Sequence, residues 1–162
     1  MTTAICAGSF NPITMGHMDI IRRTADLFDS VRVVVVFNSN KKCIFTLEER
    51  LEHLRKVTAD LPNVQVDSWD GLLVEYAARF PHPVIVRGLR AMSDFEYEFQ
   101  MAHMNKKLDS QVETFFMAAS EKYTYLSSSA VRELGAYGCD ISEFIPPEIL
   151  SEVSERCVKQ NQ

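Results

Sequence analysis

Short apolar runs alternate along the whole chain with longer segments in which apolar residues recur at helical spacing. Continuous apolar or β-branched runs are typical of buried parallel strands, whereas the helical spacing predicts helices that pack on one face. The predicted strands are Thr3–Ala7, Val31–Phe37, Val64–Trp69, Val84–Val86 and Glu113–Ala118. Strands that alternate with helices indicate parallel pairing through right-handed crossovers. The expected fold class is therefore α/β, with a Rossmann-like doubly wound five-stranded parallel sheet and helices on both faces.

Capping residues, glycine and proline mark the expected helix ends. The predicted helices cover Met15–Phe28, a segment after Thr46, Leu72–Phe80, a segment from Ser93 to about Leu108, a short segment after Ser127 and a last one from Pro146-Pro147. Thr46-Leu47-Glu48-Glu49 and Ser93-Asp94-Phe95-Glu96 have the spacing of capping boxes. Gly135 or Gly138 is expected to end the short helix. We expect one domain over residues 1–162, with a C-terminal helical segment from about residue 128.

The connection between the first strand and the first helix has features of a phosphate-binding loop. Residues 7–17 are Ala-Gly-Ser-Phe-Asn-Pro-Ile-Thr-Met-Gly-His. Small residues let the backbone approach a ligand closely, and the N-terminus of the following helix suits an anion. Thr14 can cap this helix, which places His17 in its first turn, directed at the same anion. Neither the P-loop pattern nor Gly-x-Gly-x-x-Gly is present, and an ordinary strand–turn–helix in which His17 only caps is the alternative.

Composition and charge narrow the class of protein. The chain has 162 residues, of which 46% are hydrophobic and 24% charged, and its net charge is −5. Such a charge argues against broad attraction to nucleic acid, so an anionic substrate must be met by local basic groups. No apolar run is long enough to span a membrane, and the N-terminus lacks the layout of a signal peptide. The four scattered cysteines favour reduced thiols, so we expect a cytoplasmic protein with neither nucleic-acid nor membrane partners.

Three further segments follow predicted strands and carry groups suited to anions. Arg87-Gly88-Leu89-Arg90 comes directly after a buried strand, and guanidinium groups can fork onto phosphate oxygens. The alternative is that both arginines pair with acidic residues of the following helix. Lys41 and Lys42 lie in the loop after the second strand, where they either reach a phosphate or are simply solvated. Ser127-Ser128-Ser129 offers a second helix N-terminus, for a ligand or for capping alone. Ligands of such sheets bind at the carboxyl ends of the strands, which would gather these segments into one site.

Other catalytic chemistries find little support in the sequence. His53, His82 and His103 lie on helices or in a proline-flanked turn, and no His/Cys/carboxylate spacing indicates a protein-bound transition metal. No Ser-His-Asp arrangement or activated cysteine is indicated. We therefore expect no covalent enzyme intermediate and no metal ligands among the side chains.

Nearly the full length of the chain resembles one family. The first loop resembles the Gly-x-Phe-Asp/Asn-Pro-x-x-x-Gly-His signature of the nucleotidylyltransferase superfamily. The segments that resemble the bacterial phosphopantetheine adenylyltransferases in particular are Lys41-Lys42 with Phe45-Thr46-Leu47-Glu48-Glu49-Arg50, Arg87-Gly88-Leu89-Arg90-Ala91, Asp94-Phe95-Glu96-Tyr97-Glu98, Ala102-His103-Met104-Asn105 and Leu126-Ser127-Ser128-Ser129. The arginine segment and its Phe-Glu-Tyr-Glu extension are more specific than the Gly-His motif, which the whole superfamily shares.

The resemblance implies reversible transfer of the adenylyl group from ATP to 4′-phosphopantetheine, which gives dephospho-coenzyme A and pyrophosphate. The catalytic residues that it implies are His17, Lys41 and Arg90. The phosphopantetheine-binding residues that it implies are Ser9, Lys41, Leu73, Arg87 and Asn105. The ATP-binding residues that it implies are Ser9, Phe10, His17, Gly88, Leu89, Arg90, Glu98, Tyr123, Thr124, Tyr125, Leu126, Ser127, Ser128 and Ser129. It also implies Mg²⁺ bound mainly through the ATP phosphates, inhibition by coenzyme A and a homohexamer.

The chain departs from the family pattern at a few positions, and two rival functions stay open. Asn11 replaces the usual Asp, Ser9 a common Thr, Cys6 a frequent Tyr and Met15 a frequent Asn. These changes put details of the pocket wall in doubt rather than the reaction. The first rival is an adenylyl- or cytidylyltransferase with another phosphate-bearing acceptor, such as nicotinate mononucleotide. The second is a silent nucleotide-binding sensor that binds ATP without releasing pyrophosphate.

Overall fold

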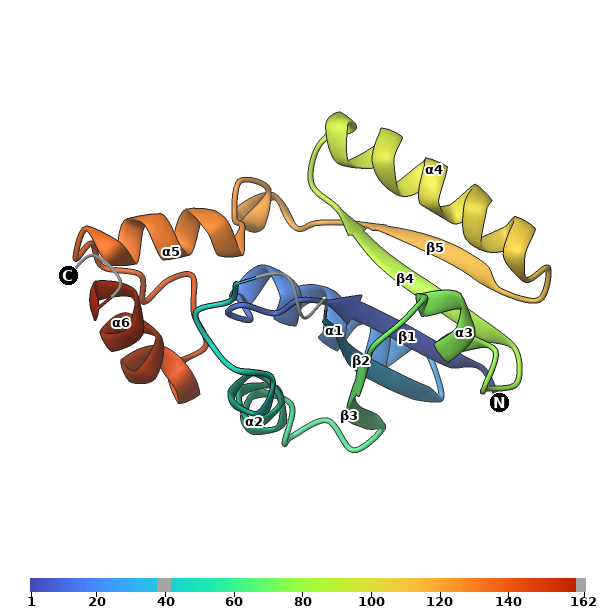
Figure 1. The fold of residues 1–162 in the computed structure, drawn as a ribbon, viewed down its shortest axis with the longest axis horizontal. Coiled ribbons are helices and arrows are strands. Elements are labelled where there is room, and N and C mark those ends of the chain that lie inside the picture. Colours follow the sequence, from blue (N-terminus) through green and yellow to red (C-terminus); the bar gives the residue numbers. More distant parts are fainter. Residues whose placement is uncertain (38–41, 160–162) are drawn as a thin grey trace.

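The protein folds around a five-stranded sheet whose strands are all parallel. The computed structural model describes residues 1–37 and 42–159. The strands are β1 (Thr3–Gly8), β2 (Ser30–Val36), β3 (Val64–Trp69), β4 (Pro83–Leu89) and β5 (Glu113–Ala118). Their order is β3-β2-β1-β4-β5, so the direction of winding reverses between β1 and β4 (Figure 1). The predicted doubly wound parallel sheet is confirmed.

Helices connect the strands and cover both faces of the sheet. The helices are α1 (Met15–Leu27), α2 (Leu47–Val57), α3 (Leu73–Ala77), α4 (Met92–Leu108), α5 (Ser128–Ala136) and α6 (Leu150–Lys159), with short 3₁₀ turns at η1 (Glu121–Tyr123) and η2 (Pro147–Ile149). Ala4 and Cys6 of β1 belong to a core cluster that includes side chains of α1, α2, α5 and α6. Ile5, between them in the strand, belongs to a second cluster that includes Tyr76 of α3. Successive strand residues point to opposite faces, so this alternation shows that both faces are buried.

Several predicted boundaries are wrong, and the physical reasons are local. β4 continues to Leu89 instead of ending at Val86, because pairing with β5 carries Arg87 and Gly88 into the ladder. α4 begins at Met92 after Ala91, and the predicted Ser93 capping box is absent. The carboxylate of Asp94 instead accepts the backbone N–H of Arg90, at 3.2 Å. The predicted helix over 72–80 is the shorter α3, which ends at Ala77.

Helices α5 and α6 pack closely on each other at the carboxyl-end side of the sheet (Figure 1). Gly135 makes the close approach possible, because a Cβ built on it would lie 2.7 Å from the Cβ of Cys157. Gly138, with φ of +74°, follows the end of α5 and takes the left-handed conformation that ends many helices. Arg156 of α6 holds α2 through Glu49, at 2.6 Å, so the helical segment from residue 128 is joined to the rest of the fold.

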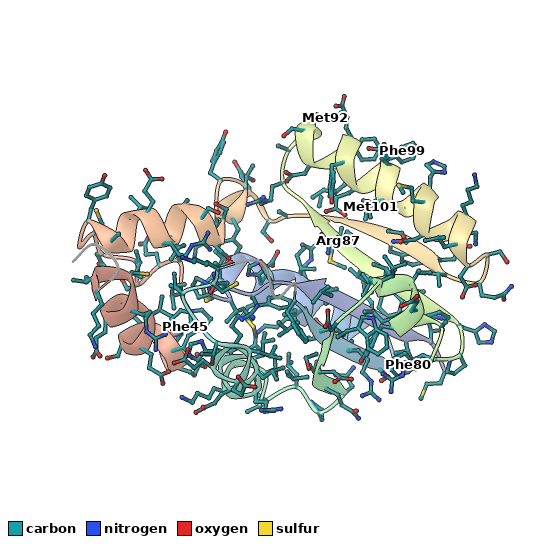
Figure 2. All side chains as sticks on the ribbon, in the orientation of Figure 1. Phe45, Phe80, Arg87, Met92, Phe99 and Met101 are labelled. Carbon is teal, nitrogen blue, oxygen red and sulfur yellow. The ribbon has the colours of Figure 1, made fainter. Side chains whose placement is uncertain are left out.

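Helix α4 differs from the others because none of its residues is buried. It rests on β5 through Phe95, whose ring lies 5.8 Å from that of Phe116, yet large apolar side chains such as Met92 and Phe99 stay exposed along the helix (Figure 2). Over the described ranges 1–37 and 42–159, none of the helices is both long and apolar enough for a membrane span.

Candidate active site

One cavity opens at the carboxyl ends of the central strands, where the winding of the sheet reverses. Its volume is about 530 Å³. The end of β1, the end of β4, and the N-terminal turns of α1, α4 and α5 form its walls. This is the position at which open α/β sheets bind ligands. The first loop, the Arg87–Arg90 segment and the Ser127 segment meet there as predicted, whereas Lys42 does not line the cavity.

The loop between β1 and α1 forms the floor of the cavity. Gly8, Ser9 and Phe10 line it. Phe10 has a φ of +46°, which is rare for a bulky residue, and its buried ring meets the ring of His17 edge-on with centroids 5.2 Å apart. The loop therefore places the first turn of α1 directly against the cavity.

His17 is held in one orientation by the cap of α1. The Thr14 side chain accepts the N–H of His17 at 3.3 Å, and the Thr14 N–H donates to Nδ1 of His17 at 3.0 Å. The predicted Thr14 cap is thus confirmed, with His17 serving as the second half of a capping box. Because Nδ1 accepts this hydrogen bond, the neutral imidazole carries its proton on Nε2. His17 can then donate from Nε2 to an anion in the cavity.

Charge and burial keep this imidazole neutral. Burial lowers the pKa of His17 to about 4, and the positive charges of Arg90 and Arg87 act in the same direction. At physiological pH this imidazole is therefore uncharged and donates one hydrogen bond, from Nε2, to a phosphate. Burial also raises the pKa of the Cys6 thiol to about 11, so this cavity cysteine is poorly suited to act as a nucleophile.

The lowered pKa of His17 predicts a measurable pH dependence of stability. Between pH 6.5 and 4 the unfolded chain takes up a proton on this side chain that the folded chain does not, so stability falls as the pH is lowered through that window. We expect this residue alone to cost about 2 kcal/mol between pH 6.5 and 4.5. Urea unfolding at fixed protein concentration, compared with His17→Gln, isolates the contribution. Equal pH slopes in the two proteins would contradict the lowered pKa of His17 in the folded protein.

Arg87 is anchored between the first loop and α4. Its Nε and Nη2 each donate to Glu98 at 2.7 Å, and its Nη1 donates to the carbonyl of Ala7 at 2.7 Å. The pairing with an acidic residue of the following helix, given above as the alternative, is confirmed here. It does not remove the side chain from the site, because both Arg87 and Glu98 line the cavity.

Arg90 joins the β4 loop to the segment before α5. Its Nε lies 3.3 Å from the carboxylate of Asp94, and its Nη1 donates to the carbonyl of Leu126 at 2.6 Å. Gly88 in the same strand lets β4 lie against α1, since a Cβ there would approach Ile20 to 2.9 Å. The side chains of Arg87, in β4, and Arg90, directly after it, thus both line the cavity.

The N-terminus of α5 closes the opposite wall. Ser127 caps the helix by accepting the N–H of Ala130 at 3.1 Å, and Ser128 donates to the carbonyl of Pro12 at 2.7 Å. The segment before it is tied to α1, where Asp19 accepts from the Ser120 hydroxyl at 2.8 Å. These contacts bring a second helix N-terminus to the same cavity as that of α1.

Most of the site residues named from the sequence meet in this cavity. Those that line it are Ser9, Phe10, His17, Arg87, Gly88, Arg90, Glu98, Tyr123, Leu126, Ser127 and Ser128. Those that do not line it are Leu73, Leu89, Asn105, Thr124, Tyr125 and Ser129. Leu73 instead packs against the core cluster on the α3 face, and Tyr125 is 96% exposed. Lys41, expected at the reacting phosphates, lies outside the described residues.

The structure also brings in residues that the sequence had not assigned to the site. Ser93, Asp94 and Tyr97 of α4 line the cavity, as does Ile20 of α1. The signal for Asp94 was present, because it stands four residues before Glu98 and therefore shares its helix face. Nothing comparable marks Ile20, which reads as an ordinary core position.

Comparison with known proteins defines the class of this site. The family model described as cytidylyltransferase-like matches residues 5–134. The chain belongs to the cytidylyltransferase-like family. It is therefore a nucleotidyltransferase by family, in agreement with a phosphate-suited cavity at two helix N-termini.

A relative narrows the family further. The chain is 52% identical over 159 residues to a protein of Caldanaerobacter subterraneus subsp. tengcongensis named phosphopantetheine adenylyltransferase, and the match covers 98% of this chain and 99% of the relative. This places the chain among the phosphopantetheine adenylyltransferases. A solved structure from Vibrio parahaemolyticus, assigned as a nicotinate-nucleotide adenylyltransferase, superposes with a TM-score of 0.64 and 22% identity over 97% of this chain and 98% of that one. At that identity the similarity supports the fold alone.

Proposed function

We propose that the protein transfers the adenylyl group of ATP to 4′-phosphopantetheine, which yields dephospho-coenzyme A and pyrophosphate. The observation that carries this proposal is the neutral His17, held by Thr14 with its Nε2–H free to donate, in a cavity that Arg87 and Arg90 also line. The extensive identity to a named phosphopantetheine adenylyltransferase supports the choice of acceptor.

The proposed mechanism is a direct in-line displacement. The acceptor phosphate is anionic at neutral pH, so it needs no general base to attack the α-phosphorus of ATP. The bond from the α-phosphorus to the bridging oxygen breaks, and pyrophosphate leaves with that electron pair. Negative charge grows on the α-phosphate oxygens, where His17, the α1 N-terminus and Lys41 would stabilise it. Catalysis then consists of positioning and electrostatic stabilisation, with no covalent enzyme intermediate and a reversible overall reaction.

We propose that Mg²⁺ accompanies ATP and is held mainly through its phosphates. Residues 1–37 and 42–159 contain no group of three or more His, Cys, Asp or Glu side chains that could hold a metal ion. The two cavity carboxylates, Asp94 and Glu98, pair with Arg90 and Arg87. Bound in this way, the ion would offset the charge of the triphosphate.

The acceptor is tested by measuring pyrophosphate release with Mg-ATP and either 4′-phosphopantetheine or nicotinate mononucleotide. We expect release only with phosphopantetheine, with dephospho-coenzyme A identified by mass, and ATP formation when dephospho-coenzyme A and pyrophosphate are supplied. Release only with nicotinate mononucleotide would discard the acceptor. ATP binding with no release from either acceptor would favour the silent sensor.

We also propose that the protein assembles as a homohexamer and that coenzyme A inhibits it. Coenzyme A contains both the adenylyl and the pantetheine parts of the two substrates, so it would compete for the same cavity. The assembly would cover the exposed apolar side chains of α4, which include Met92, Phe99, Met104 and Leu108.

The assembly predicts a mass in solution of six times 18.5 kDa. Phe99→Asp should lower that mass, because it buries a charge in the proposed interface. Leu27→Asp, at an exposed apolar position of α1 outside that surface, is the control and should leave the mass unchanged. Sedimentation equilibrium measures both, and a monomeric wild-type protein would refute the proposed assembly.

A further inference from the structure

The loop at the floor of the cavity has a backbone conformation that its surroundings must hold. Phe10 adopts a φ of +46°, in the left-handed region, which is strained for a bulky residue. Its side chain is only 5% exposed. A strained, buried residue at the floor of a ligand cavity calls for contacts that fix the peptide groups around it.

The peptide between Ser9 and Phe10 is held from behind by a buried arginine. Nη1 of Arg50 donates to the carbonyl of Ser9 at 2.9 Å, and Nε donates to the carbonyl of Thr46 at 3.3 Å. Arg50 is 6% exposed and does not line the cavity, whereas Ser9 and Phe10 do. One guanidinium therefore joins the cavity floor to the N-cap residue of α2.

Peptide geometry makes this contact directional. In a trans peptide the carbonyl and the following N–H point in opposite directions, so a Ser9 carbonyl turned toward Arg50 turns the Phe10 N–H away from it. In the described part of the chain this N–H finds no protein acceptor. It is thus left available on the cavity side of the loop, where an anionic oxygen would satisfy it.

The burial of Arg50 is also unusual for a purely structural arginine. Within residues 1–37 and 42–159, Arg50 forms no salt bridge with a carboxylate. A buried charge without a counter-ion costs stability, and carbonyl contacts compensate it only in part. A positive charge behind a phosphate-binding loop, however, raises the potential at the loop without touching the ligand.

We propose that Arg50 is a positioning residue for adenylyl transfer, which fixes the Ser9–Phe10 peptide so that the Phe10 N–H meets a phosphate oxygen of the nucleotide. This inference rests on the proposed function for the identity of the anion. Arg50 itself contacts neither substrate. Removing the Arg50 side chain should therefore displace the Phe10 N–H rather than remove a group that contacts the substrate.

The kinetic test compares Arg50→Met with Arg50→Lys and with Leu54→Ala. Leu54 is fully buried in the same helix and belongs to the hydrophobic core, so its truncation lowers stability while the hydrogen bond from Arg50 to the Ser9 carbonyl is kept. We expect Arg50→Met to lower kcat about 10- to 100-fold, with a smaller change in KM for ATP, and Arg50→Lys to recover part of the loss. Leu54→Ala should keep kcat within about 3-fold while its urea midpoint falls. Wild-type kcat in Arg50→Met, or an equal loss in Leu54→Ala, would overturn the proposal.

A spectroscopic test does not depend on the acceptor. In protein labelled with ¹⁵N-Phe, with Phe10→Tyr used to assign the signal, α,β-methylene-ATP should shift the Phe10 amide, and Arg50→Met should abolish that shift while other signals still report binding. An unmoved Phe10 amide in the wild type would overturn the proposal even if Arg50→Met does not fold. If the wild type shows the shift but releases no pyrophosphate with phosphopantetheine, the proposed function fails and the role of Arg50 in holding the loop stands.

Discussion

Replacing His17 by alanine is expected to lower kcat by about 10²–10³-fold while changing the Kd of ATP only a few-fold. The structure supplies the reason, since Thr14 fixes Nδ1 and leaves Nε2–H as the single donor. With a pKa of about 4, this donor is neutral at physiological pH. Its hydrogen bond strengthens as negative charge develops on the transferred phosphate. An interaction that strengthens only in the transition state lowers kcat when it is lost, with little effect on binding.

The measurement is steady-state pyrophosphate release together with ATP binding by calorimetry. His17→Gln keeps an N–H donor of similar reach and should lie between the wild type and His17→Ala. His82→Asn is the matched control, because His82 is an exposed histidine outside the cavity with a φ of +46°, which asparagine tolerates. Near-normal turnover in His17→Ala, or a loss confined to ATP affinity, would contradict the assigned role.

Replacing Gly135 by alanine is expected to destabilise the fold by about 2 kcal/mol, which is the largest stability effect that we predict for a single methyl group. Alanine gains roughly 1 kcal/mol of helix propensity over glycine. Against this, the new Cβ would lie 2.7 Å from Cβ and 3.0 Å from Sγ of Cys157, so α5 and α6 must separate. Overpacking of this kind costs 1–3 kcal/mol or more, and backbone separation belongs to the upper part of that range.

The effect should extend to catalysis, because α5 begins at the cavity. A shift of this helix moves Ser127 and Ser128, so we expect a lower affinity for ATP as well as a lower urea midpoint. In a double-mutant cycle, Cys157→Gly should cost less stability in the Gly135→Ala protein than in the wild type, because it removes the atoms that the new methyl group meets. Gly138→Asn is the control, since nothing lies within 4 Å of a Cβ there and asparagine tolerates the positive φ. A Gly135→Ala protein as stable as the wild type would show that the two helices do not pack this closely.

The sequence predicted the fold and the place of the site because both depend on short-range patterns. The β-branched run of β2 and the Thr46 capping box lie within a few residues, and their local physics decides the element. The rule that parallel sheets bind ligands at their carboxyl ends then brought His17, Arg87 and Ser127 together without any knowledge of the packing.

Predictions were less accurate where a side chain could form a hydrogen bond or ion pair with more than one partner. The Ser93 segment has the spacing of a capping box, but α4 begins earlier, at Met92. Asp94 therefore stands at the third position of the helix and accepts the N–H of Arg90 instead. The arginines were predicted to meet phosphates or to pair with acidic residues, and sequence spacing does not decide between these. The structure shows that both are paired and both line the cavity.

By itself, the sequence determined the alternating α/β order, the caps of α1 and α2, and the glycine- and histidine-bearing loop that begins the site. Only the tertiary structure decided that Arg50 reaches the Ser9 carbonyl across 41 positions, and that Gly135 is where α6 meets α5. The physical reason is the range of the interactions. Propensity, capping and periodicity act between residues a few positions apart, whereas these contacts exist only after the elements have packed, when each buried polar group takes the partner that the packing brings within reach.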